Sequence, residues 1–187
     1  MGAAALTALL AVTACEPGAA DTGGGTTPGP SESRGEETAT ATATACSDAD
    51  LSITTAVYPR DEVRHLLLTS TNTGDEECAL FRHPVVRFDG GPEDQVGPME
   101  SEMQDPVIAP GGKAYAGMLL FRIGAQTDAV ETMTVTLQGG AEDTEPIEAP
   151  LPDGTTFLDI DDNPLVTCWN ADRETTEKTM FQAAGGT

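Results

Sequence analysis

A period of two in the apolar residues dominates the sequence from residue 46 to about residue 170. Apolar residues alternate with polar ones at 51–55 and 132–137, which predicts strands with one buried face. In 63–70, Val63, His65, Leu67 and Thr69 oppose Arg64, Leu66, Leu68 and Ser70, which predicts a further strand. The run 114–121 is apolar at its odd-numbered and its even-numbered positions, which predicts a strand buried on both faces. Turn residues separate the runs, at Asn72-Thr73-Gly74, Asp89-Gly90-Gly91-Pro92, Pro110-Gly111-Gly112, Gly139-Gly140 and Asp153-Gly154. No segment of the domain carries a helical period. We therefore predict an all-β domain, a single antiparallel immunoglobulin-like β-sandwich, over residues 46–170.

The residues on either side of this domain differ from it in composition. Between Gly18 and Ala45 the chain has no Val, Ile, Leu, Met or aromatic residue. It cannot bury enough apolar surface to offset its chain entropy, so residues 15–45 are predicted to be a disordered tether with a reach of roughly 30 Å. Residues 171–187 are expected to form a C-terminal strand or tail.

The N-terminal residues have the pattern of a bacterial lipoprotein signal. A stretch of apolar and small residues precedes Val12-Thr13-Ala14-Cys15, in which small residues suit the signal peptidase and the cysteine thiol accepts the lipid. Residues 1–14 are therefore predicted to be the signal peptide and Cys15 the lipidation site. They contain no Lys or Arg, although a signal usually opens with basic residues, so we expect the start codon to lie upstream of Met1. The predicted location is extracytoplasmic, on the outer face of the cell membrane.

Several ordered sequence blocks of the domain resemble a known family. They are Cys46-Ser47-x-Ala49-Asp50-Leu51, the segment from Leu66 through Thr71-Asn72-Thr73-Gly74 to Cys78-x-Leu80, His83-Pro84-x-Val86, and Ile108-x-Pro110-Gly111-Gly112-x-Ala114. Together they resemble a family of actinobacterial envelope lipoproteins catalogued as domain of unknown function 4232. The resemblance implies a secreted or lipid-anchored single β-sandwich and implies no activity. Members often carry a further cysteine near Ala129 to Met133, which this chain lacks.

With Cys15 assigned to the lipid, three cysteines remain to be paired. In a meander the start of the first strand lies beside the end of the second, which favours a disulfide between Cys46 and Cys78. Closing that loop stabilises the fold by about 3 kcal/mol. Cys168 would then be a free thiol, either buried beside Trp169 or reactive. The alternative pairing, Cys46 with Cys168, stays open.

The charge of the chain is strongly acidic, with 31 acidic and 9 basic residues and a net charge of −22. Phosphates would be repelled, so nucleic acid and anionic lipid headgroups are poor partners, and no nucleic-acid partner is expected. The excess acid is explained most simply as a solvated surface. The competing interpretation is attraction of cations, cationic peptides or a basic partner.

An acidic loop near the C-terminus is the sharpest candidate for a metal site. Asp159, Asp161 and Asn163 have the spacing that opens a calcium-binding loop. The sixth position holds Pro164 instead of Gly and the twelfth holds Asn170 instead of Glu, which excludes an EF-hand. What remains is either a weaker calcium site shared with another acidic loop or an acidic turn before the proline.

Motifs that would indicate catalysis are absent from the sequence. There is no G-x-S-x-G, H-E-x-x-H, P-loop, G-x-G-x-x-G or C-x-x-C pattern. A hydrolase would need His65 or His83 beside an acid in a concave pocket. We expect instead a non-catalytic envelope protein that presents its β-sandwich to a protein or glycan. The alternative is a calcium-binding module without any other cofactor.

Overall fold

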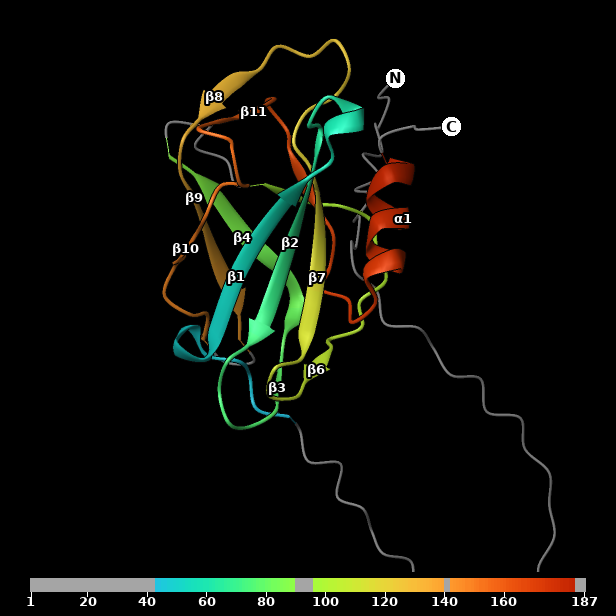
Figure 1. Cartoon of the computed structure of the whole chain (residues 1–187). Coiled ribbons are helices and arrows are strands. Elements are labelled where there is room, and N and C mark those ends of the chain that lie inside the picture. The colour runs from blue at the N-terminus through green and yellow to red at the C-terminus, as the bar shows by residue number, and fades with distance from the viewer. Residues whose placement is uncertain (1–42, 90–95, 140–141, 184–187) are drawn as a thin grey trace, which may run out of the picture.

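The computed structural model of the chain describes residues 43–89, 96–139 and 142–183 (Figure 1). Strands make up most of its regular secondary structure, which also includes two 3-10 turns, η1 (Asp48–Asp50) and η2 (Pro59–Asp61), and one α-helix, α1 (Arg173–Ala183). The strands are β1 (Leu51–Val57), β2 (His65–Asn72), β3 (Cys78–Ala79), β4 (Phe81–Phe88), β5 (Gly97–Pro98), β6 (Val107–Ile108), β7 (Lys113–Leu119), β8 (Asp128–Val130), β9 (Met133–Gln138), β10 (Ile147–Ala149), β11 (Leu158–Ile160) and β12 (Leu165–Val166). The predicted all-β character is confirmed for the domain, and the four predicted strands correspond to β1, β2, β7 and β9.

The strands form two larger sheets and two small ones. The first larger sheet has the order β1-β2-β7-β12-β5 and the second has the order β10-β9-β4. Two strand pairs, β11-β8 and β3-β6, complete the fold. Every pairing is antiparallel except that of β12 with β5.

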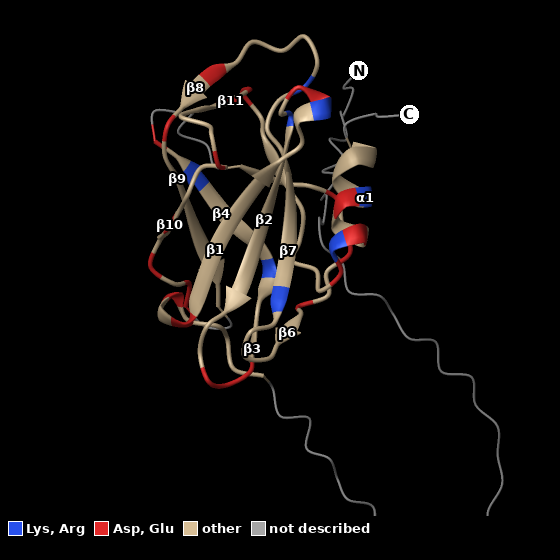
Figure 2. Ribbon diagram, viewed as in Figure 1, with Lys and Arg blue, Asp and Glu red and all other residues tan. Residues whose placement is uncertain are grey.

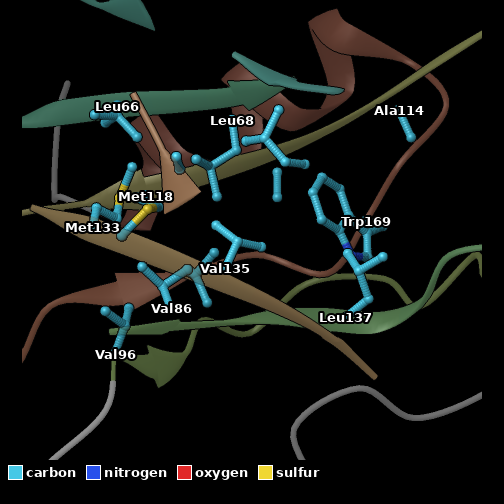
Figure 3. Packing of buried hydrophobic residues seen from close by; sticks show 14 of the residues in the cluster. Leu66, Leu68, Val86, Val96, Ala114, Met118, Met133, Val135, Leu137 and Trp169 are labelled. Atoms are coloured by element: carbon cyan, nitrogen blue, oxygen red, sulfur yellow. The ribbon is translucent and has the colours of Figure 1, made fainter. Parts of the chain in front are cut away.

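One hydrophobic core lies between the two larger sheets (Figure 3). Strand β2 contributes Leu66 and Leu68, which face Met118 and Ala116 in the register of β2 with β7. The opposing sheet contributes the alternate residues of β9, Met133, Val135 and Leu137. Trp169, whose side chain is fully buried, closes one end of this cluster. Because the alternate residues of each strand point the same way, the period of two in the sequence becomes a single shared core.

The other face of the first sheet is covered by helix α1, which corrects the expected strand or tail at 171–187. Met180 is fully buried there and packs with Met99, which directly follows β5, and with Leu119 of β7. The helix begins because the Asp172 carboxylate accepts a hydrogen bond from the Thr175 amide at 2.7 Å, an N-cap that holds the pKa of Asp172 below its ordinary value. Thr176 and Met180, four residues apart, form its buried stripe. So narrow a stripe in a polar segment gives little helical signal in the sequence.

The predicted disulfide between Cys46 and Cys78 is confirmed. It links the start of the domain to β3, where Ala45 bridges Ala79 and the Ala79 amide donates to the Thr44 carbonyl at 2.8 Å, so Thr44 and Ala45, which are predicted to lie in the tether, pair with the domain. The expectation of a free thiol at Cys168 is wrong, because Cys168 is disulfide-bonded and no cysteine of the described residues is free. The alternative pairing of Cys46 with Cys168 is excluded by the same geometry.

The predicted lipidation site Cys15, the signal peptide at 1–14 and the tether through residue 42 lie outside the described residues. Within the described ranges, none of the helices has the length and apolar character needed to cross a lipid bilayer.

Candidate functional site

Three connecting segments converge at one end of the sheets, which we call the loop end. They are residues 58–64 between β1 and β2, residues 120–127 between β7 and β8, and residues 150–157 between β10 and β11. In Figure 1 this is the upper end, where β8 and β11 lie. The turn that carries Cys78 and the first described residues lie at the lower end. The loop end therefore lies on the far side of the domain from the point at which the N-terminal segment joins it.

A cavity of about 300 Å³ opens at the loop end. All three segments line it, through Glu62, Val63, Phe121, Gly154, Thr155, Thr156, Phe157, Leu158 and Asp159. Its walls combine two aromatic rings, two threonine hydroxyl groups and two carboxylates. A hollow that brings apolar side chains together with a few polar groups is a common form of binding site.

The apolar part of this site is exposed to solvent. Phe157 is 49% exposed, and Ile123, on the same loop as the half-buried Phe121, is 78% exposed. These two and Val107, which lies on β6 at the opposite end, are the large hydrophobic side chains that are exposed in the described part of the chain. Of the three, Phe157 alone lines the cavity, so its exposed ring offers an apolar contact surface there.

The backbone at the rim of the cavity adopts an unusual conformation. Glu62 and Val63 have φ angles of 64° and 63°, in the left-handed region that β-branched residues rarely enter. The next residue holds the turn in place, since the Arg64 carbonyl accepts a hydrogen bond from the Leu120 amide at 2.8 Å. Strain of this kind persists where the surrounding structure imposes it, and it often marks functional sites.

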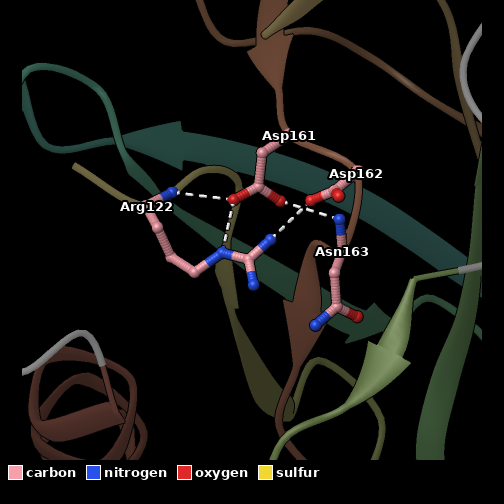
Figure 4. A network of polar contacts seen from close by, with 4 residues as sticks. All are labelled: Arg122, Asp161, Asp162 and Asn163. Atoms are coloured by element: carbon pink, nitrogen blue, oxygen red, sulfur yellow. Dashed lines mark hydrogen bonds and ion pairs between the residues drawn. The ribbon is translucent and has the colours of Figure 1, made fainter. Parts of the chain in front are cut away.

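An ion-pair network fixes the 120–127 loop (Figure 4). Arg122 donates to Asp161 Oδ2 from its backbone amide at 2.9 Å and from Nε at 2.7 Å, and to Asp162 Oδ1 from Nη2 at 2.8 Å. The other oxygen of Asp161 accepts the Asn163 amide at 2.9 Å. Burial of Asp161 opposes ionisation, but these hydrogen bonds outweigh it and lower the pKa of Asp161 below 3.8.

The three residues of the predicted calcium loop are not arranged as a ligand set. Asp159 is exposed on β11, whereas Asp161 is buried and both of its oxygens already accept protein donors. Across the described residues, no group of three His, Cys, Asp or Glu side chains is placed to hold a metal ion. The acidic turn before Pro164 thus serves the Arg122 network, and calcium binding stays a prediction.

His65 does lie beside an acid, as a hydrolase would require, but not in an open pocket. Its Nδ1 is hydrogen-bonded to Asp61, and Phe181 of α1 packs edge-on against the ring at 4.8 Å between centroids. The side chain is 1% exposed, and His65 does not line the loop-end cavity. The pair joins η2 to β2 beneath the helix, which is a structural role.

A second cavity, of about 380 Å³, lies at the opposite end. Its acids are Asp50, Asp75, Glu76 and Glu77, and no aromatic side chain lines it. Figure 2 shows acidic segments at both ends of the sheets. The two cavities therefore share negative charge and differ in aromatic character.

Sequence reasoning did not find the residues that line the loop-end cavity. Glu62 and Phe157 are 95 positions apart, and neither belongs to a recognised motif. The available signal was weak: Phe157 is an aromatic residue in a segment of turn-forming residues that includes Asp153-Gly154.

Comparison with known proteins identifies a family but no activity. The model of the family described as "Domain of unknown function (DUF4232)" matches residues 46–170. No curated protein and no solved structure matches the chain. Helix α1 lies beyond the matched residues.

Proposed function

We propose that this chain, which belongs to the DUF4232 family, is a non-catalytic, lipid-anchored protein of the cell envelope whose loop end binds a protein or glycan partner. The observation that carries the proposal is the placement of the loop-end cavity and the exposed Phe157 on the far side of the domain from the N-terminal segment. A domain anchored through that segment would direct its loop end away from the membrane.

The architecture we propose is an immunoglobulin-like β-sandwich. Two predominantly antiparallel sheets share one core, and the loops gather at the two ends. Such sandwiches commonly bind through the loops at one end, because the sheets hold loop residues in fixed positions while the loops themselves tolerate variation.

The location we propose is the outer face of the cell membrane, with the lipid on Cys15. The disulfide between Cys46 and Cys78 supports an oxidising compartment, since disulfides persist there and are rare in the cytosol. The signal-like residues before Cys15 support the anchor.

The anchor is tested by the intact mass of the protein extracted from its native membrane. We expect a chain that begins at Cys15 and carries a diacylglyceryl group. A cysteine sulfur that holds the lipid in a thioether cannot also form a disulfide. Recovery of Cys15 without lipid in a disulfide-linked peptide would therefore contradict the anchor.

The binding role is tested by photo-crosslinking in the native envelope. A photoreactive phenylalanine analogue replaces Phe157 at the loop end in one strain and Val107 on β6 in another. The two positions are matched, because they are 49% and 50% exposed and lie at opposite ends of the domain. We expect a discrete crosslinked product from position 157 alone. Equal products from both positions, or a product from position 107 alone, would count against a binding loop end.

A further inference from the structure

We infer that the loop-end cavity takes a lysine or arginine side chain from a basic peptide segment of the partner. This inference rests on the proposed function of the loop end and adds the chemistry of the ligand. It follows from three observations. The cavity has unpaired carboxylates, aromatic rings lie beside them, and the whole chain is strongly acidic.

The two carboxylates of the cavity are available to a ligand. Glu62 and Asp159 are both exposed at the cavity, and neither side chain has an ion-pair or hydrogen-bond partner among the described residues. The three loops carry Arg60, Arg64 and Arg122, and none of these arginines lines the cavity. Arg122 is held by Asp161 and Asp162, and Arg64 donates from Nε to the Asp61 carbonyl oxygen at 3.1 Å.

The aromatic rings suit the rest of such a side chain. Phe121 and Phe157 line the same hollow as the carboxylates. Lysine and arginine lay their aliphatic stems along apolar surface while the charged end reaches a polar group. The face of an aromatic ring also attracts a cation through its quadrupole. An anionic or wholly apolar ligand would leave the two carboxylates unmatched.

Charge over the whole chain favours the same ligand. The net charge of −22 draws a basic segment toward the protein and speeds encounter. The acidic cavity at the opposite end shares this field but has no aromatic wall, so it offers no surface for the aliphatic stem. The loop-end cavity is therefore the one of the two that can hold such a side chain.

The test uses the full 187-residue chain, labelled with 15N, and three probes. The first is a capped octapeptide that alternates lysine with leucine. The second is the same peptide with glutamine in place of lysine, and the third is a soluble oligomer of N-acetylglucosamine. We expect the lysine peptide alone to shift the amide signals of Phe121, Thr155, Thr156 and Phe157.

Two double variants with the same change in net charge distinguish binding at the cavity from attraction by the negative charge of the whole chain. E62Q/D159N removes the cavity carboxylates, and E76Q/E77Q removes two acids at the opposite end. All four side chains lack ion pairs among the described residues, so both variants keep the fold, which the amide spectrum verifies. We expect E62Q/D159N to lower the affinity for the lysine peptide about tenfold and E76Q/E77Q to lower it less than twofold. The effect is modest because exposed ion pairs contribute little.

The inference is overturned if the glutamine peptide binds as well as the lysine peptide, if the two double variants weaken binding equally, or if the lysine peptide shifts no loop-end signal. In any of these cases the proposed binding function can still hold. It is supported if the N-acetylglucosamine oligomer shifts the amide signals of the loop end and position 157 gives a crosslinked product. Failure of that crosslink would remove the proposed function itself.

Discussion

Gly117 lies where helix α1 comes closest to the first sheet. A Cβ atom at this position would stand 2.7 Å from Met180 Sδ and 2.9 Å from Met180 Cβ. The sulfur atom is part of a flexible side chain, but the Cβ atom moves only with the helix backbone. A glycine is therefore required for the helix to dock at its observed distance.

Replacing Gly117 with alanine is expected to lower the free energy of unfolding by about 1–3 kcal/mol, because overpacking forces the helix away from the sheet. Urea unfolding of G117A, M180A and the double variant measures the effect. We expect the two changes to be partly non-additive, since M180A removes the Met180 Sδ and Cγ atoms that the new methyl group meets and leaves only the Cβ atom at 2.9 Å. Fully additive losses would show that the cost of G117A does not come from the contact with Met180 Sδ and Cγ.

Asp161 is the residue that holds the 120–127 loop at the candidate site. Its pKa is lowered, so the folded chain binds this proton more weakly than the unfolded chain does. The stabilisation by Asp161 is therefore complete above its ordinary pKa of 3.8 and is lost as the pH falls through the lower folded value. The hydrogen bonds to Arg122 and Asn163 are the cause.

We expect Asp161→Asn to lower the free energy of unfolding at pH 7 by about 1–3 kcal/mol, because buried charge-assisted hydrogen bonds are lost. The loss should shrink as the pH falls below 3.8 toward the lowered pKa at which the folded Asp161 carboxylate becomes protonated. Asp162→Asn is the matched control, since Asp162 also pairs with Arg122 but its side chain is 92% exposed. Equal losses in the two variants at pH 7, measured by thermal unfolding, would contradict this account.

At the scale of elements, helix α1 determines that strands of the first sheet are buried on both faces. Strand β2 is buried at four consecutive residues, His65 to Leu68, because the core covers one face and the helix covers the other. The helix is held by the buried Met180 and by a polar contact, in which the Tyr58 hydroxyl donates to Glu177 at 2.7 Å. Burial and this hydrogen bond raise the pKa of Tyr58 to about 12.

Removal of α1 by truncation after Ala171 is expected to leave a β domain with an exposed apolar face. Leu119 and Met99 lose their cover, at roughly 1.5–3 kcal/mol for each large side chain. The truncated chain should bind a hydrophobic dye and unfold at a lower urea concentration than the full chain. Y58F in the full chain, which removes only the hydroxyl contact, should unfold close to wild type. Unchanged dye binding after truncation would refute the covering role of α1.

The whole molecule combines a compact core with an unbalanced surface charge. Its net charge of −22 adds repulsion to the folded state, since folding brings acids at both ends of the sheets closer together. The disulfide between Cys46 and Cys78, which closes a separation of 32 residues, opposes unfolding at the end where the N-terminal segment joins.

Salt is therefore expected to raise the melting temperature. Screening acts within about 10 Å at 0.1 M salt, so repulsion between exposed acids weakens while buried contacts change little. Melting curves from 0.01 to 0.5 M sodium chloride measure this. A matched series in the E76Q/E77Q variant should show a smaller increase. A melting temperature that falls with salt would mean that attractive surface pairs, and not repulsion, dominate.

The sequence alone determined those features that depend on local pattern. Alternation predicted β1, β2, β7 and β9, and the double-sided apolar run predicted that β7 is buried on both faces, because side-chain direction in a strand follows position in the chain. The meander also led to the pairing of Cys46 with Cys78. The ordered blocks from Cys46 to Ala114 led to the family.

Only the tertiary structure decided what covers the second face of β7 and what meets at the loop end. Helix α1 buries a stripe of two residues, so its stability comes from the sheet beneath it and not from a pattern visible in its own sequence. Glu62, Phe121 and Phe157 belong to three separate loops and line one cavity only because the strands between them bring those loops together. Contacts between distant segments are set by packing, which no local pattern encodes.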